Sequence, residues 1–149
     1  MAYMIYAGSI NGTPPVLKPW CLNASQTVVA GSIVVINGNK LDVAGDAASA
    51  GTIAGVAQTA HTSGTSVDAT DYVMVDVNPH SLYRMPFIGS SKTSLTLEDV
   101  GKKFDLGANA YTADLDDTTG GFLLYRGDGS EDASISQGIF QVLGNVGNV

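Results

Sequence analysis

Apolar and polar positions along the chain form short alternating or continuous runs, and this pattern predicts strands. Ser32–Ala44, SIVVINGNKLDVA, has two apolar runs on either side of Asn37-Gly38. Asn-Gly between apolar runs is a strong hairpin signal because both residues tolerate the positive φ of a tight turn. We therefore predict a hairpin with strands over Val28–Ile36 and Lys40–Ala44.

The first strand of this hairpin is apolar at every position of Ile33-Val34-Val35-Ile36. A strand covered on one face alternates, whereas a continuous apolar run is typical of a strand covered on both faces. The chain has almost no helical pattern, so we expect another subunit or a partner surface to cover the second face. Either Val34 and Ile36 or Ile33 and Val35 face that partner, since a one-residue shift in register exchanges the two pairs.

The rest of the chain continues with short strands and turn-rich connections, including a loop over residues 58–70. Gly55 in the predicted strand Thr52–Ala57 indicates a bulge or a close backbone approach. A second hairpin pairs Tyr72–Val77 with Ser81–Phe87, and Pro86 places the return strand near a sheet edge. Further strands are predicted over Phe104–Leu106, Ala110–Ala113, Phe122–Tyr125 and Ile139–Leu143.

One helical turn is predicted over Leu95–Gly101. Thr96 and Asp99 have the spacing of a capping box, and Gly101 can end the turn. Many short strands with glycine-rich turns and at most one helical turn predict an all-β fold, either an antiparallel β-barrel or a β-sandwich.

The first 20 residues differ from the rest because Pro14-Pro15 favours an extended path and cannot donate to a strand ladder. We expect residues 1–20 to form an extended N-terminal arm and residues 21–149 to form a single β domain. The arm either packs as a first strand on its own core or reaches onto a partner.

Composition adds limits on the surface and on partners. The chain has 149 residues, and charged residues make up only 14% of it, against about 25% in an ordinary soluble domain. Lys18 and Lys40 balance Asp42 and Asp46 in residues 1–60, so the whole net charge of −7 falls in residues 61–149. An acidic chain with few basic residues has no footprint for phosphate backbones, which argues against nucleic-acid binding.

Cys21 is the only cysteine, which excludes an intramolecular disulfide and a cysteine-based zinc site. The N-terminus lacks the pattern of a secretory signal. No stretch approaches the roughly 20 apolar residues that span a bilayer. We therefore expect synthesis in a cytoplasm and no membrane contact.

Catalytic motifs are missing from the sequence: there is no nucleophile elbow, phosphate-binding loop or zinc-protease helix. The two histidines, His61 and His80, fall in a loop and a turn, although a serine triad is assembled in space and leaves no linear pattern. We expect no enzymatic activity and no cofactor.

Three aspartates come closest to a metal site. Asp114, Asp116 and Asp117 are clustered carboxylates of the kind that bind Ca²⁺. The loop lacks the remaining spacing of an EF-hand, and a solvated hairpin turn explains the same residues.

Several stretches resemble, in order and spacing, the small β-proteins that decorate the heads of tailed bacteriophages. These stretches are LKPW (17–20), SQTVVAGSIVV (25–35), LDVA (41–44), GTIAGVA (51–57), VDVNPHSLYRMP (75–86) and LEDVGKKFDL (97–106). The resemblance covers roughly residues 17 to 106, and the sequence after Gly107 does not match the pattern.

This resemblance implies a capsid decoration, or cement, protein. Such a protein binds the outer surface of the expanded capsid, bridges major capsid protein subunits and stabilises the head against DNA pressure. It is a homo-oligomer, with a trimer favoured over a dimer, and it is assembled in the host cytoplasm onto the virion exterior. The expected contact residues for capsid and sister subunits are Tyr3, Ile5, Tyr6, Pro14, Pro15, Leu17, Trp20, Ile33, Val34, Val35 and Ile36.

An alternative is a glycan- or receptor-binding β-domain of a phage tail or fibre. Exposed aromatic side chains beside acidic loops would serve that role, and the candidates are Trp20, Tyr72, Tyr83 and Tyr111.

Overall fold

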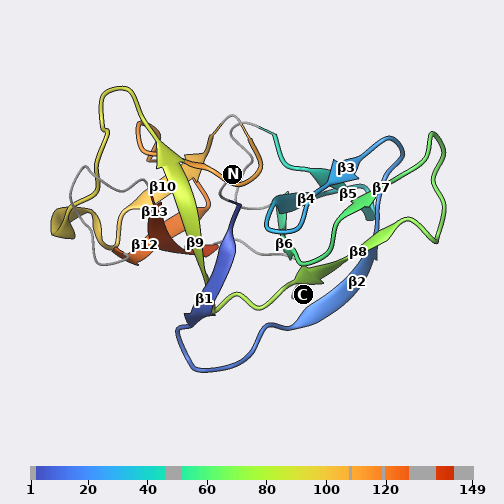
Figure 1. Cartoon of the computed structure of the whole chain (residues 1–149), viewed down its shortest axis with the longest axis horizontal. Coiled ribbons are helices and arrows are strands. Elements are labelled where there is room, and N and C mark those ends of the chain that lie inside the picture. Colours follow the sequence, from blue (N-terminus) through green and yellow to red (C-terminus); the bar gives the residue numbers. More distant parts are fainter. Residues whose placement is uncertain (1–2, 46–51, 108, 119, 128–136, 143–149) are drawn as a thin grey trace.

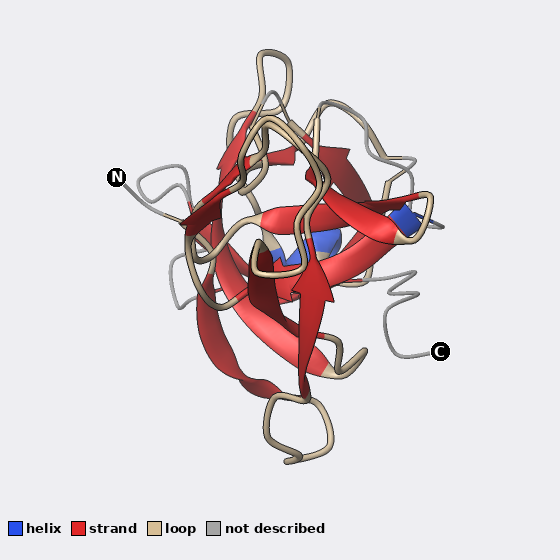
Figure 2. Ribbon diagram, turned by 90° about the vertical axis from the view of Figure 1, so that its right-hand side faces the viewer, coloured by secondary structure: helices blue, strands red, loops and turns tan. Residues whose placement is uncertain are grey.

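The computed structural model describes residues 3–45, 52–107, 109–118, 120–127 and 137–142. Strands and loops make up nearly all of this part of the chain (Figure 2). It contains no α-helix, and its labelled helical element is the short 3₁₀ turn η2. The prediction of an all-β fold is confirmed. The predicted last strand, Ile139–Leu143, extends outside the described residues at position 143.

The described residues contain thirteen strands and the short 3₁₀ turn η2. The bounds are β1 Ile5–Ser9, β2 Leu17–Cys21, β3 Thr27–Val28, β4 Ile33–Asn37, β5 Lys40–Val43, β6 Ile53–Ala57, β7 His61–Thr62, β8 Tyr72–Asp76, β9 Ser81–Ile88, η2 Leu97–Asp99, β10 Lys103–Leu106, β11 Ala113–Asp114, β12 Phe122–Gly127 and β13 Gln137–Val142.

The strands form two main sheets that lie side by side in Figure 1. One has the order β2-β8-β6-β4-β5, and a bridge between Leu22 and Leu41 brings its two edges together. The other has the order β1-β9-β11-β10-β12-β13, and an additional β9–β13 pairing closes it. Strand β7, within the predicted loop 58–70, pairs with β3 in a small separate ladder. The architecture is therefore two small barrel-like sheets that share one hydrophobic core.

The predicted hairpin is β4 and β5, and its turn lies one residue later than expected. Asn37 pairs with Lys40, so Gly38 and Asn39 occupy the centre of the turn. Gly38 has φ +68°, which suits the first central position of a type II′ turn.

Both faces of β4 are covered by the chain itself, so the expectation that an outside partner must cover one face is wrong. Ile33 lies in the core shared with the second sheet, and Val35 packs against that core. Val34 lies in the core enclosed by its own sheet, and Ile36 packs there. Ile33 and Val34 have no exposed surface. A curled sheet packed against a second sheet supplies the cover that helices supply in α/β proteins.

The predicted second hairpin is wrong, because β8 and β9 lie in different sheets and do not pair, although alternate residues along both segments face a core. Val73, Val75 and Val77 belong to the core of the first sheet. Tyr83 and Met85 belong to the shared core.

Gly55 confirms the predicted bulge and close approach. The pairing of β4 with β6 shifts register at this point. A Cβ atom on Gly55 would lie 2.1 Å from the backbone oxygen of Asp76 on β8. Only glycine allows the two strands to come this close.

The prediction that Pro86 places β9 near a sheet edge is wrong. Strand β9 is central, with β13 along one side and both β1 and β11 along the other. The β1 pairing ends at Arg84 and the parallel β11 pairing begins at Phe87. Pro86 falls in the gap between these pairings, where no donor is required.

The first 20 residues do not form a separate arm. Strand β1 pairs with β9 in one sheet, and β2 pairs with β8 in the other. Residues 10–16 connect the two sheets, and Pro14 and Pro15 lie in this connection. The segment is extended, as expected, but its strands are edges of this chain's own sheets.

The predicted helical turn is η2. The backbone N–H of Thr96 donates to the carboxylate of Asp99 at 2.8 Å, as the capping spacing predicts. Gly101 follows the turn with φ +90°.

Candidate functional site

The N-terminal segment carries a concentration of exposed apolar side chains. Among the described residues, five of the eleven exposed large hydrophobic side chains lie between positions 5 and 17. They are Ile5, Tyr6, Ile10, Val16 and Leu17, and we call them the N-terminal surface. Exposed apolar side chains that gather in one segment are typical of a protein contact site.

A buried carboxylate fastens this segment to the rest of the chain. Asp76, at the end of β8, is 2% exposed. One of its oxygens accepts the backbone N–H groups of Val16 at 3.1 Å and Asn78 at 3.0 Å. The other accepts the hydroxyl of Tyr83 at 2.7 Å. Three donors from three parts of the chain therefore meet at one carboxylate.

The side chain of Asn78 holds the proline-containing connection in the same place. Its amide nitrogen donates to the hydroxyl of Thr13 at 3.0 Å and to the carbonyl of Pro14 at 3.1 Å. The segment before β2 is therefore fixed by side-chain hydrogen bonds, in addition to its strand pairing.

Tyr83 connects this network to the shared core. Its hydroxyl donates to Asp76 and accepts the amide of Gln58 at 2.8 Å. Burial, together with the neighbouring Asp76 carboxylate, raises the pKa of Tyr83 well above its ordinary value. The hydroxyl therefore stays protonated and remains a donor.

A cavity of about 360 Å³ opens beside β1, where the two sheets meet. Its lining residues carry no charge: Tyr3, Met4, Ile5, Tyr6, Ala30, Gly31, Ala57, Gln58 and Tyr83. The rings of Tyr6 and Tyr83 pack edge to face at 5.8 Å. A Cβ on Gly31 would lie 2.6 Å from the carbonyl oxygen of Met4, so glycine lets the N-terminal segment form this wall.

The predicted contact residues divide into two groups. Ile5, Tyr6, Pro14 and Leu17 are exposed, and Tyr3, Pro15 and Trp20 are partly exposed. In contrast, Ile33 and Val34 are fully buried and Val35 and Ile36 are partly buried against the cores. The N-terminal residues are therefore accessible to a partner, whereas Ile33 and Val34 are too buried to be contact residues.

The aromatic residues proposed for glycan binding do not form a common platform. Tyr83 is 2% exposed, so the expectation that it is exposed is wrong. Lys18 lies over the ring of Trp20, with its amino group 4.3 Å from the ring centre. Tyr111 packs against Tyr3 at 4.6 Å. Tyr72 is exposed.

The acidic loop is organised by backbone donors. The carboxylate of Asp116 accepts the N–H groups of Ser90, Ser91 and Lys92 at 2.6, 3.1 and 2.9 Å. The hydrogen bond from Ser90, with that from Lys92, lowers the pKa of Asp116. Asp114 accepts the N–H of Asp116 at 2.9 Å. Asp116 therefore closes a loop, and no group of three metal-ligating side chains occurs within the described ranges.

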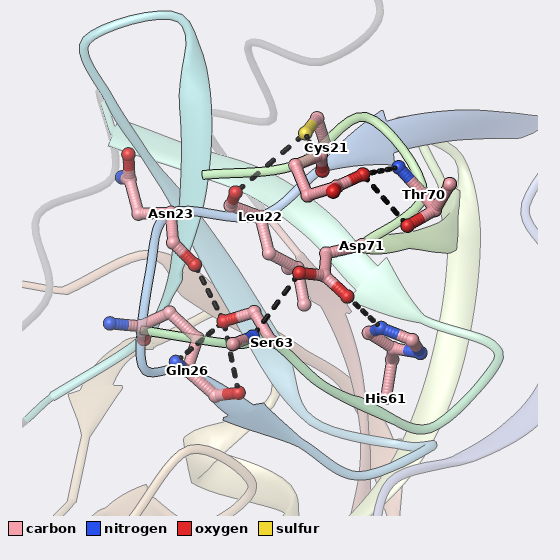
Figure 3. Close-up of polar contacts among 10 residues, drawn as sticks. Cys21, Leu22, Asn23, Gln26, His61, Ser63, Thr70 and Asp71 are labelled. Carbon is pink, nitrogen blue, oxygen red and sulfur yellow. Dashed lines mark hydrogen bonds and ion pairs between the residues drawn. The ribbon is translucent and has the colours of Figure 1, made fainter. Parts of the chain in front are cut away.

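A second polar cluster surrounds His61 (Figure 3). His61 Nε2 lies 2.7 Å from the carboxylate of Asp71, which also accepts the N–H of Gly64 at 3.1 Å. The hydroxyl of Ser63 donates to the carbonyl of Asn23 at 2.7 Å and accepts the N–H of Gln26 at 2.8 Å. The Ser63 hydroxyl is thus bonded to backbone groups, and within the described residues no hydrogen bond joins it to His61.

Cys21 and His80 have structural surroundings. The thiol of Cys21 contacts the carbonyl oxygen of Asp68 at 3.3 Å, in the loop that precedes β8. His80 is exposed, and its backbone N–H donates to the side chain of Asn78 at 3.0 Å. Among the described residues, neither side chain forms a hydrogen bond with a group that could act with it in catalysis.

Sequence reasoning missed Asp76 and Asn78, which hold the N-terminal surface in place. Their signal was the VDVNPH stretch, in which an aspartate interrupts an apolar strand just before a turn. A carboxylate at the end of a buried strand requires donors. The sequence does not reveal that one of those donors, the backbone N–H of Val16, lies 60 residues away.

Comparison with known proteins adds no assignment, because no family model matches the chain and no curated protein matches it. None of the described helical segments is long and apolar enough to cross a bilayer.

Proposed function

We propose that this protein is a structural virion protein that binds the outer surface of an expanded bacteriophage capsid through its N-terminal surface. It bridges major capsid protein subunits there and stabilises the head against the pressure of packaged DNA. The order and spacing of the stretches over residues 17–106 support this class of protein, and the all-β fold agrees with it.

The observation that carries the proposal is an exposed apolar segment held in a fixed conformation. Strand pairing and the Asp76 and Asn78 hydrogen bonds order the segment before any partner binds. A preordered surface loses little conformational entropy on docking. A protein that must resist a steady mechanical load benefits from such a contact.

The charge distribution also supports the proposal. Residues 1–60 are electrically neutral, whereas residues 61–149 carry the net charge of −7. A neutral apolar part suits burial against coat subunits, and an acidic part suits the solvent side.

Self-association as a homotrimer belongs to the same proposal. The buried β4 strand does not supply a self-contact, so the N-terminal surface is the part of the chain to which we assign it. Closed symmetric oligomers bury matching patches of this kind.

Cosedimentation with expanded, DNA-free phage heads tests the proposal. The variant Ile5→Asp/Leu17→Asp places two charges on the N-terminal surface, and both replaced side chains are about half exposed. We expect the variant to stay folded and to lose head binding, because burying an unpaired charge is costly. Sedimentation velocity on the same variant reports its oligomeric state.

The matched control is Leu97→Asp. Leu97, on η2, is 76% exposed and lies outside the N-terminal surface. The control should bind heads as the wild type does. Equal binding by the wild type and the double variant would remove the N-terminal surface from the proposal, and a wild type that does not bind heads would refute it.

A further inference from the structure

The connection between β1 and β2 contains an Asn-Gly pair, Asn11-Gly12, whose asparagine side chain has two donors on one oxygen. Oδ1 of Asn11 accepts the backbone N–H of Thr13 at 3.2 Å and the hydroxyl of Thr13 at 2.6 Å. All three residues are exposed to solvent. Donors on a carbonyl oxygen draw electrons from its carbon, so the side-chain carbon Cγ of Asn11 is both polarised and accessible.

Asn78 fixes the direction of the Thr13 hydroxyl. The side-chain nitrogen of Asn78 donates to the oxygen of this hydroxyl at 3.0 Å, and the side-chain oxygen of Asn78 accepts the N–H of His80 at 3.0 Å. A hydroxyl has a single hydrogen to donate. Because the Asn78 amide supplies the hydrogen on its side of Thr13, the hydroxyl hydrogen is directed at Asn11. The chain of donors from Asn78 through Thr13 therefore ends on the polarised carbonyl.

Gly12 provides an unhindered nitrogen next to this carbonyl. Its φ is +77°, and a Cβ atom on Gly12 would have no other atom within 4 Å. Among the described residues, no acceptor is bonded to the Gly12 N–H group. The nitrogen can therefore approach the Asn11 side chain without losing a hydrogen bond and without a side chain of its own in the way.

We propose that Asn11-Gly12 is a site of spontaneous deamidation assisted by Thr13. The backbone nitrogen of Gly12 gives its proton to solvent base and attacks Cγ of Asn11. The bond from Cγ to the side-chain nitrogen breaks, and this nitrogen takes up a proton and leaves as ammonia. Water then opens the cyclic succinimide at one of its two carbonyls, which gives aspartate or isoaspartate. The two Thr13 donors stabilise the negative charge that develops on Oδ1 during the attack.

The other Asn-Gly pair of the chain, Asn37-Gly38, has the opposite surroundings. The side-chain nitrogen of Asn37 donates to the carboxylate of Asp42 at 2.7 Å, which holds the leaving group. The charge of this carboxylate also opposes a second negative charge beside it. Within the described part of the chain, the side-chain oxygen of Asn37 accepts no hydrogen bond. Asn37 is therefore an internal control with the same dipeptide and without the donors.

Deamidation changes the charge of the N-terminal surface. Residues 1–17 contain no acidic or basic side chain. The product is a carboxylate at position 11, directly after Ile10, which is 39% exposed and belongs to the N-terminal surface. A charge that loses its water in an apolar contact weakens that contact. This consequence rests on the proposed function: protein that stays unassembled for long should lose its affinity for heads.

Ageing of the purified full chain tests the site without phage heads. The protein is kept warm at mildly alkaline pH, and conversion at each asparagine is followed by the change in peptide mass from amide to acid. We expect Asn11 to convert about tenfold faster than Asn37, since each lost donor slows the attack severalfold. Conversion of Asn37 at the same rate as Asn11, or faster, would overturn the site.

Three threonine variants test the assistance by Thr13. Thr13→Val removes the hydroxyl donor and should slow conversion of Asn11 by about fivefold. Thr13→Ser keeps the hydroxyl and should age at the wild-type rate. The control Thr65→Val, at an exposed position in the loop between β7 and β8 far from β1 in Figure 1, should also age as the wild type does. Conversion in Thr13→Val as fast as in the wild type would overturn the assistance, because a merely structural role predicts no rescue by serine.

Head cosedimentation tests the consequence for docking. Anion exchange separates aged protein into unmodified and deamidated fractions, and Asn11→Asp serves as the genetic match. Ser66→Asp, in the exposed loop between β7 and β8, is the control of equal charge. We expect the apparent Kd to weaken by about fivefold or more for deamidated protein and Asn11→Asp, and to stay within about twofold for the control.

The outcomes separate the site from the proposed function. Deamidation at Asn11 with unchanged head binding would support the site and overturn its effect on docking. Wild-type protein that deamidates at Asn11 but never binds heads would refute the proposed function and still support the site.

Discussion

Replacing Asp99 by asparagine should destabilise the protein, and it should do so only where the carboxylate is ionised. Asp99 is 1% exposed and its two oxygens contact the amino groups of Lys92 and Lys102 at 2.9 and 3.0 Å. Burial by itself raises the pKa of Asp99. The hydrogen bonds from Lys92, the Thr96 backbone and Lys102 outweigh this effect and lower the pKa from 3.8 to about 2.

The magnitude follows from the difference between folded and unfolded chains. A pKa difference of one unit corresponds to about 1.4 kcal/mol, so the ionised Asp99 stabilises the folded state by about 2 to 3 kcal/mol. A depressed pKa means that this stabilisation is complete above pH 3.8 and is lost as the pH falls through about 2. Asp99→Asn should therefore lower the free energy of unfolding by that amount near neutral pH, and the difference from wild type should disappear at the acid end.

Urea unfolding followed by the fluorescence of Trp20, the single tryptophan, measures this difference across the acid range. The matched control is Glu98→Gln, which removes an exposed neighbouring carboxylate that has no side-chain partner among the described residues and should change stability by less than about 0.5 kcal/mol. Parallel pH profiles of wild type and Asp99→Asn would refute the reasoning. A loss of stability in Glu98→Gln equal to that in Asp99→Asn would refute it too.

Two further substitutions test the packing of the two sheets. Gly55→Ala should lower the unfolding free energy by about 3 kcal/mol or more, because the new Cβ meets the Asp76 carbonyl oxygen at 2.1 Å. The control Gly45→Ala, whose new Cβ has no atom within 4 Å, should be tolerated. Equal urea midpoints for the two variants would contradict the close approach. Tyr83→Phe leaves one oxygen of Asp76 without its donor and should lower the free energy of unfolding by about 1 to 3 kcal/mol in the same assay. The control Tyr125→Phe, at an exposed position, should have no effect. If Tyr83→Phe left the stability unchanged, the Asp76 network would not stabilise the fold.

Local chemistry allowed much of the fold to be predicted. The turn after β4, the bulge at Gly55 and the capped turn at Thr96 each depend on residues close in sequence, and each was found. The turn after β4 is shifted by one residue because an Asn-Gly-Asn sequence offers two neighbouring placements for a two-residue loop. Ile5 and Leu17, which the sequence suggested as contact residues, are exposed in the structure.

Long-range placement was not predictable. The apolar run Ile33–Ile36 correctly predicted a strand covered on both faces, but whether the cover came from another subunit or from the same chain was decided by sheet curvature and by the packing of the second sheet. The central place of β9 and its parallel pairing with β11 were likewise invisible.

The sequence by itself determined that this protein is built of strands, where most of them turn, and which side chains are apolar, because those properties depend on backbone preferences and on neighbours a few residues apart. Only the tertiary structure decided that β4 is covered by its own chain and that Asp76 holds the N-terminal surface in place. The physical reason is that burial and hydrogen-bond pairing depend on residues brought together from distant parts of the chain, and a linear pattern does not record which of them meet.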